Sequence, residues 1–372
     1  MQDVVVGPAE RSTGDSGVIT RAELRTSDGV VPISFETPAG VALARRNLGD
    51  VFVAPALLVA MRKGVPLHIT DPVSPSLLSS LETWSSIYAT WFPTALQRVP
   101  IEAPRGRDRT PSRGARGKVG QCMTGGIDSL YSLLTVDTPP DVLVYALGVE
   151  LADPRRVPTA DATARLTEIA RRHDRPLVLL HTNVRKVLLD SDLTWGGIAH
   201  GAALASIGHL LNGGISTFVI PATHSYATAQ PWGSTPWTDP LLSSSSLRVE
   251  HHGAEKNRVG KTEAIAHESD VRDCLRVCLK HTSDENCGTC RKCVRTMLAL
   301  DLFGGLAESR RFPQRVEPEV ADAITLTSTQ DLRHIIDIRD RALELATRPD
   351  ILAMCDAMVD RSERAIGALE NA

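Results

Sequence analysis

The chain has 372 residues, of which 42% are hydrophobic and 23% are charged, a composition typical of a globular protein of about two domains. Its 41 Lys and Arg residues against 44 Asp and Glu residues give a formal net charge of −3, which disfavours a dedicated nucleic-acid-binding protein. The sequence has neither the long apolar run of a membrane helix nor the pattern of a signal peptide. We therefore expect a cytoplasmic protein that acts on small molecules.

The N-terminal region, residues 1–101, predicts a small α+β domain. Two strand-like stretches, residues 17–26 and 30–37, flank a Ser-Asp-Gly turn signal, as in a β-hairpin. Residues 102–117 follow, with two prolines, three glycines, five arginines and almost no apolar side chains. We interpret this segment as a basic linker that marks a domain boundary, and the alternative is a mobile flap whose arginines cover a phosphate ligand.

Residues 118–305 alternate between strand-like and helix-like segments. Apolar strands at 118–124, 141–149, 176–183 and 216–223 are separated by segments with helical periodicity. This βαβ spacing predicts an α/β fold with a parallel sheet covered by helices, in which ligands bind at the carboxyl ends of the strands. Residues 306–372 show apolar residues at helical spacing, which predicts a helical extension that packs on the domain or forms a homodimer contact.

A glycine-rich loop lies between the first of these strands and its helix. It suits pyrophosphate, because glycines let the backbone approach an anion and the free N–H groups of the following helix point into the same space. The aspartate in the loop either caps the helix or holds a Mg²⁺ ion that bridges phosphates. The lysine and spacing of a Walker A loop are absent. The residues of this loop are Thr124, Gly125, Gly126, Ile127, Asp128 and Ser129.

Five of the seven cysteines lie within 20 residues. Four of them have the spacing C-x8-C-x2-C-x2-C, which can surround one tetrahedral Zn²⁺ ion; because all four positions are thiolates, the site is closed and its role is structural. An iron–sulfur cluster and unligated thiols are the alternatives. The four are Cys278, Cys287, Cys290 and Cys293. The fifth, Cys274, together with Cys122 and Cys355, is either a small buried side chain or a persulfide carrier.

The strand at 216–223 runs into a long irregular loop rich in Pro, Gly, Ser and Trp. A loop at the carboxyl end of a sheet strand is the expected place for substrate specificity. Any single residue there can equally be an ordinary loop residue. The candidates are His224, Ser225, Tyr226, Trp232 and Asp239.

The loop at 124–129 resembles the S-G-G-x-D-S loop of the PP-loop ATP pyrophosphatases, with Thr124 in place of the usual serine. Together with the cysteine knuckle and Arg295 just after it, the sequence is similar to the 7-cyano-7-deazaguanine synthase family of the queuosine pathway over residues 118–303. The resemblance implies ATP, Mg²⁺ and Zn²⁺ as ligands and a phosphate-neutralising role for Lys261. It also places His200 where relatives have nucleotide-contacting residues. The Y-P-D-C-R-like string of that family is absent, which disfavours the family's nitrile-forming substrate.

These features lead to three functional hypotheses. The first is an ATP-dependent ligase, in which Asp128, Ser129 and Lys261 support adenylation of a carboxylate or amide oxygen, PPi leaves, and a nitrogen nucleophile displaces AMP. The second is ATP-dependent sulfur insertion by a persulfide cysteine. The third is an ATP-binding sensor or scaffold without chemistry. The acceptor and the nitrogen or sulfur donor are not specified by the sequence.

Overall fold

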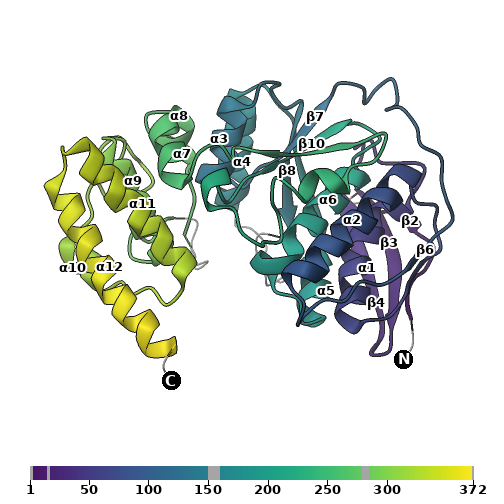
Figure 1. Cartoon of the computed structure of the whole chain (residues 1–372). Coiled ribbons are helices and arrows are strands. Elements are labelled where there is room, and N and C mark those ends of the chain that lie inside the picture. Colours follow the sequence, from purple (N-terminus) through teal and green to yellow (C-terminus); the bar gives the residue numbers. More distant parts are fainter. Residues whose placement is uncertain (1–2, 15–16, 150–159, 279–284, 371–372) are drawn as a thin grey trace.

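The structure of the chain, a computed structural model, describes residues 3–14, 17–149, 160–278 and 285–370. One mixed, mostly parallel sheet runs through the molecule, with helices on both faces and a group of C-terminal helices to one side (Figure 1). The strands are β1 (Val4–Val6), β2 (Glu10–Gly14), β3 (Gly17–Thr26), β4 (Gly29–Thr37), β5 (Leu67–Ile69), β6 (Ile101–Glu102), β7 (Val119–Cys122), β8 (Val142–Leu147), β9 (Leu177–Thr182), β10 (Thr217–Pro221) and β11 (Arg248–His252). The α-helices are α1 (Gly49–Lys63), α2 (Pro75–Trp91), α3 (Ile127–Thr135), α4 (Ala160–Arg172), α5 (Val184–Asp190), α6 (His200–Leu210), α7 (Arg258–Ile265), α8 (Ser269–Cys274), α9 (Arg291–Leu302), α10 (Pro318–Asp322), α11 (Thr329–Leu345) and α12 (Pro349–Glu370).

The predicted alternation of strands and helices in the middle of the chain is confirmed. Strands β9, β8, β7, β10 and β11 are neighbours in that order, and all four pairs are parallel. The last strand, β11, was not predicted, because its sequence RVEHH is largely polar. The fold class is therefore α/β with C-terminal helices, as the sequence indicated.

The N-terminal strands extend the same sheet. The predicted hairpin is confirmed, with Thr26 opposite Gly29. Strand β4 then pairs antiparallel with β9, where Phe35 faces Thr182, so the sheet continues from the N-terminal strands into the parallel strands without a break. That the regions before and after residues 102–117 fold independently of each other stays a prediction. In the structure this segment ends at the amino ends of β7 and β10, where the N–H of Gly117 donates to Ser216 Oγ.

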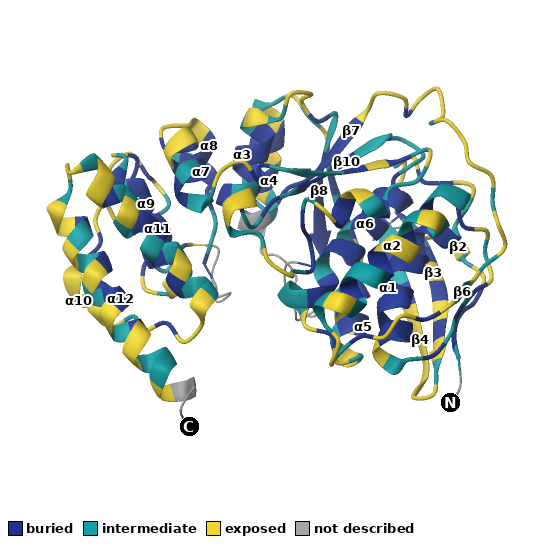
Figure 2. Cartoon of the chain, in the orientation of Figure 1, coloured by how far each residue is buried: buried dark blue, intermediate teal, exposed yellow. Residues whose placement is uncertain are grey.

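Each face of the parallel sheet is covered by its own hydrophobic core. In β8, Val144 and Ala146 belong to the core under α1, α5 and α6, while Leu143 and Tyr145 belong to the core under α3 and α4. This alternation follows from the two-residue period of a strand. Figure 2 shows the same arrangement, with buried strands between helices that expose only their outer sides.

The C-terminal helices pack on the second of these cores. Helix α11 contacts α7 and α9, and α12 folds back along α11 after Ala346, which has a left-handed φ of 51°. Buried apolar residues of α11 and α12, among them Ile335 and Met358, join the core that also holds α3 and α9. Within the described ranges, no helix has the length and apolar character needed to cross a membrane. The helical extension thus reaches the region of the glycine-rich loop.

Candidate functional site

The glycine-rich loop lies where the strand order of the parallel sheet reverses. From β7 the chain adds β8 and β9 on one side, and it then returns to add β10 and β11 on the other side. In open α/β sheets the loops that follow two such strands leave the sheet in opposite directions, and the space between them is the usual ligand site.

The loop is braced by its own hydroxyl groups. Gly125 has a φ of 74°, a left-handed conformation that favours glycine. The Gly126 N–H donates to Thr124 Oγ1 over 3.3 Å, and Ser129 Oγ donates to the Gly126 carbonyl over 3.0 Å. The predicted hydroxyl donors therefore stabilise the loop, while Ile127 is buried in the core. The N–H groups of the first turn of α3 have no partners within the helix and remain suited to an anion.

Asp128 lies between two cationic side chains of α7. Its Oδ2 forms an ion pair with Arg258, and its Oδ1 is 3.4 Å from Lys261 Nζ. Lys261 is only 1% exposed, and its ammonium also donates to the Ala222 carbonyl over 2.5 Å. Helix α7 therefore turns Lys261 inward against the end of β10 and does not leave it exposed at the helix start.

The pKa values of these groups reflect burial and pairing. Burial by itself would raise the pKa of Asp128, but attraction to Arg258 and Lys261 outweighs it and the pKa lies below its ordinary value. Burial lowers the pKa of Lys261, and the Asp128 carboxylate opposes this shift only in part. Two cations facing one carboxylate leave a net positive charge at the loop, which favours an anionic ligand.

The arrangement fits phosphate better than a magnesium ion. Both carboxylate oxygens of Asp128 already face cationic groups, whereas Mg²⁺ needs oxygen ligands that are not so occupied. A magnesium role for Asp128 therefore stays a prediction from the sequence. Phosphate oxygens, by contrast, can accept from Arg258, Lys261 and the N–H groups of α3.

A cavity of about 150 Å³ opens next to this ion cluster. It has room for roughly ten water molecules at ~10–15 Å³ each. Its walls come from the loop after β10, the start of α7 and one face of α11. They are formed by Thr223, His224, Ser225, Thr228, Gln230, Asn257, Arg258, Thr329, Gln330, Arg333, His334 and Asp337.

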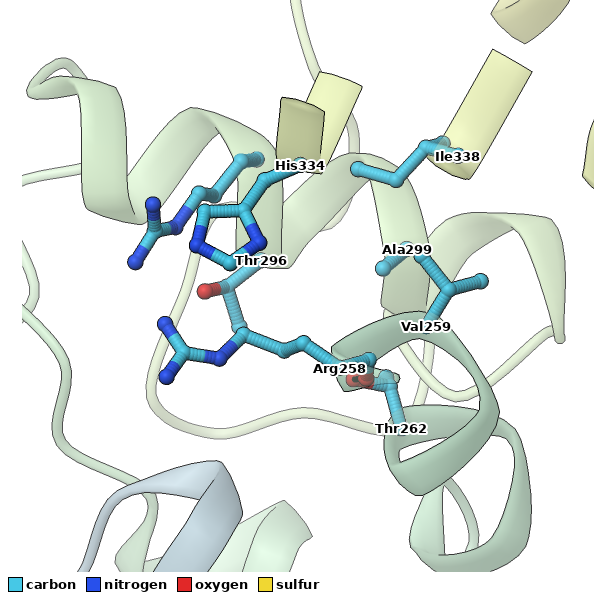
Figure 3. A pocket seen from close by; sticks show the side chains of 8 residues that line it. Arg258, Val259, Thr262, Thr296, Ala299, His334 and Ile338 are labelled. Atoms are coloured by element: carbon cyan, nitrogen blue, oxygen red, sulfur yellow. Dashed lines mark hydrogen bonds between the residues drawn. The ribbon is translucent and has the colours of Figure 1, made fainter. Parts of the chain in front are cut away.

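Two neutral histidines line the cavity. Burial, and secondarily Arg258, lowers the pKa of His224 from 6.5 to about 4. Burial also lowers the pKa of His334 strongly, with Arg258 and Arg295 adding to the shift. Figure 3 draws a neighbouring pocket that shares Arg258 and His334 with this cavity, and it shows the His334 ring and the Arg258 guanidinium on the same side, away from Ala299 and Ile338. A neutral imidazole has one donor and one acceptor nitrogen, and Nε2 of His224 already faces the side-chain amide of Gln330 at 3.3 Å.

The other predicted substrate residues are distributed unequally around this cavity. His224 and Ser225 line the cavity, and the Trp232 ring meets His224 edge-on with centroids 5.2 Å apart. Tyr226 is 59% exposed and is not among the residues that line this cavity. His200 is half-buried beneath Trp232, with Nδ1 3.3 Å from the Trp195 carbonyl.

The side chain of Asp239 is buried and hydrogen-bonded within the protein. It is fully buried, accepts from Ser234 Oγ over 2.5 Å and lies 2.8 Å from Nδ1 of His251. These contacts fix the irregular loop onto β11. Its carboxylate is therefore engaged within the protein.

Sequence analysis missed several residues of the cavity. Arg258 lies three residues before Lys261 and shares its helix face, which is a signal that helical spacing could have supplied. Gln330, Arg333 and His334 come from α11, in a region interpreted only as packing helices. Nothing in the local sequence indicates that this helix meets the β10 loop.

The four predicted metal cysteines converge. Their sulfur atoms all lie within 4.8 Å of one another, with Cys278 to Cys290 at 4.0 Å and Cys287 to Cys293 at 3.9 Å. Sulfurs at tetrahedral positions about 2.3 Å from a zinc ion are roughly 3.8 Å apart, so the cluster can hold a metal ion such as zinc. The Cys290 N–H also points to Cys287 Sγ over 3.3 Å, as in a metal knuckle.

Comparison with known proteins adds no assignment. No family model matches the chain, and no curated protein or solved structure matches it. The site must therefore be interpreted from its own chemistry.

We predict one tightly bound zinc ion per chain. Changing Cys290 to Ser should reduce bound zinc to below about a tenth of an equivalent and lower thermal stability, because metal binding contributes directly to folding. Elemental analysis of freshly purified protein measures the metal. Cys274→Ala, which removes a nearby thiol outside the cluster, is the control and should keep its zinc; iron in place of zinc, or no metal in the wild type, contradicts the prediction.

We predict that His224 destabilises the folded chain in acid. With a folded pKa of about 4 against an ordinary value of 6.5, the unfolded chain takes up a proton that the folded chain refuses, so stability falls as the pH drops from 6.5 to 4. Denaturant unfolding at pH 7 and pH 4.5 should show that His224→Gln loses about 1–2 kcal/mol less than the wild type. Equal losses in the two proteins contradict this assignment.

Proposed function

We propose that the chain is an ATP-dependent ligase of PP-loop type. ATP binds with its phosphates on residues 124–129, an acceptor carboxylate or amide oxygen attacks the α-phosphorus, and PPi leaves. A nitrogen nucleophile then displaces AMP from the adenylated acceptor. One observation carries the proposal: the Thr-Gly-Gly-Ile-Asp-Ser loop lies at the strand-order reversal, with Arg258 and Lys261 held against it.

The cations support this chemistry by their position. Charge accumulates on the phosphate oxygens as PPi departs, and a fixed ammonium or guanidinium at that point lowers the barrier without reorganising at the moment of reaction. Lys261 is held rigidly by the Ala222 carbonyl and by Asp128. The Arg258 guanidinium can turn from Asp128 toward a phosphate bound at the loop, because Asp128 and the bound phosphate would lie next to each other. No magnesium ligand from the protein is required.

The acceptor binds in the adjoining cavity. Arg258 belongs to both the ion cluster and the cavity wall, so an acceptor oxygen placed there is close to the phosphate loop. The cavity's amide, hydroxyl and neutral imidazole groups suit a small polar molecule that is oriented by hydrogen bonds. Helix α11, in the C-terminal extension, supplies five of the twelve residues that line this cavity.

The sulfur-insertion alternative has less support. The backbone carbonyl of Cys274 lies near Gly125, but its thiol is buried and burial raises the pKa of that thiol, which leaves little reactive thiolate at neutral pH. Burial also raises the pKa of Cys355 to about 12, and Cys122 is buried within the sheet. A nucleotide sensor without chemistry stays a third hypothesis.

The direct test is the product pattern. The protein is incubated with ATP, magnesium, ammonium and a panel of small carboxylic acids and amides, and nucleotide products are separated. A ligase forms AMP and PPi in an acceptor-dependent manner. ADP and phosphate, or ATP binding with no turnover across the panel, argue against the proposal.

We predict that Lys261→Met lowers AMP formation by at least about a hundredfold, because it removes one fixed charge at the departing phosphates. The methionine fills the same buried space and leaves Asp128 paired with Arg258, but the Ala222 carbonyl loses its donor, so the free energy of unfolding should fall by about 1–3 kcal/mol and turnover is compared at a temperature where both proteins are folded. Lys256→Met, at an exposed position in the same segment, is the control and should keep full turnover. Asp128→Ala is a less selective test of catalysis, because it leaves the buried Lys261 ammonium without the Asp128 carboxylate as its counter-ion.

We predict that no cysteine outside the metal cluster is needed for turnover. Cys122→Ala, Cys274→Ala and Cys355→Ala should each keep AMP formation within about tenfold of the wild type, because only small packing losses follow. Turnover is measured at equal zinc content and at a temperature where all variants are folded. Loss of product formation in Cys122→Ala or Cys274→Ala alone favours sulfur transfer instead.

A further inference from the structure

The segment 274–278, which we term the strap, lies directly against the glycine loop. The N–H of Arg276 donates to the Gly125 carbonyl over 2.9 Å. The carbonyl oxygen of Cys274 lies 3.8 Å from where a Cβ at Gly125 would be, and the carbonyl of Arg276 lies 3.7 Å from that position at Gly126. The backbone of the strap thus lies within van der Waals reach of both glycines, in addition to the hydrogen bond at Gly125.

The other side of the strap is held by Asn286, immediately before the second cysteine of the metal cluster. Asn286 is buried, and its Oδ1 accepts from the N–H groups of Val277 and Cys278 over 2.9 and 3.2 Å. Its Nδ2 donates to the carbonyls of Leu275 and Arg311 over 2.9 and 3.2 Å. The Asn286 side chain therefore makes all four hydrogen bonds that an amide can make, and three of them go to the strap.

The strap is consequently shared by two sites. At its end, Cys278 belongs to the metal cluster, and the Arg276 side chain turns back to donate to the Cys278 carbonyl over 2.6 Å. At its middle, Arg276 holds Gly125, whose left-handed backbone has no side chain of its own to stabilise it. A glycine is conformationally permissive, so its conformation in the folded protein depends on such external contacts.

We propose that Asn286 is a positioning residue for the phosphate loop: it fixes the strap between the cysteine cluster and Gly125, so that an intact metal knuckle sets the conformation of residues 124–129. What the loop binds rests on the function proposed above. The positioning itself does not, because it concerns only contacts within the chain.

The primary experiment is hydrogen exchange on zinc-loaded full-length protein. In Asn286→Ala, the Arg276 amide and the amides of residues 124–129 should exchange at least about tenfold faster than in the wild type, while those of β8 keep their protection. Thr289→Ala is the matched control, because Thr289 is exposed and its hydroxyl contacts Cys287 Sγ, so the change touches the knuckle and keeps all four hydrogen bonds of Asn286. Faster exchange throughout the chain, or unchanged exchange in the loop at full zinc content, overturns the proposal.

A second measurement covers the case in which Asn286→Ala fails to fold. Zinc is removed from the wild type with a zinc-selective chelator, and loop exchange and ATP affinity are both followed. Faster loop exchange together with an ATP affinity at least about tenfold weaker, each restored by added zinc, supports the proposal. A loop that keeps its protection without zinc overturns it. If the loaded wild type binds no ATP, the proposed function fails, but the exchange result still decides the positioning role.

Discussion

The buried ammonium of Lys261 is the constraint on which the arrangement of this site depends. A charge that is 1% exposed is costly to bury and is tolerated only when it is paired and hydrogen-bonded. Its two partners come from the start of α3, through Asp128, and from the end of β10, through the Ala222 carbonyl. The single side chain therefore fixes α7 against both loops at the strand-order reversal, and with it the position of Arg258. In our proposal, the phosphate groups of the ligand interact with the Lys261 ammonium, a charge that the fold already has to neutralise.

Two hydrophobic cores hold the surroundings of that ion cluster in place. One core lies beneath the N-terminal strands, α1 and α6, and the other joins α3 and α4 to the C-terminal helices. Because the second core includes α9, α11 and α12, the C-terminal extension is anchored by the same apolar burial that supports the glycine loop. Helix α11 can then offer His334 and Gln330 to the cavity from a rigid position. The extension is thus part of the candidate site as well as of the packing.

The cysteine cluster has a similar double role. Four thiols within 4.8 Å of one another can hold a metal ion such as zinc, and a closed site of this kind stabilises the local chain. The first cysteine also ends the segment whose backbone lies against Gly125 and Gly126. In our proposal, the folding free energy of metal binding is transmitted through this segment to a loop that contains two glycines and has little intrinsic conformational preference. Structural and functional sites are separated by only a few residues of shared backbone.

The sequence by itself determined the features that depend on short-range patterns: alternating strands and helices in the middle of the chain, the hairpin at Gly29, the glycine turn before α3, and the four cysteines whose spacing fits one metal ion. Only the tertiary structure decided which distant groups meet there. It joined the N-terminal strands to β9, turned Lys261 inward, gave Asp239 a structural role and brought His334 to the cavity. The physical reason is that periodicity, turn propensity and ligand spacing are properties of a few neighbouring residues. Ion pairs, burial and cavity walls arise between residues far apart in the chain, and the local sequence does not identify those partners.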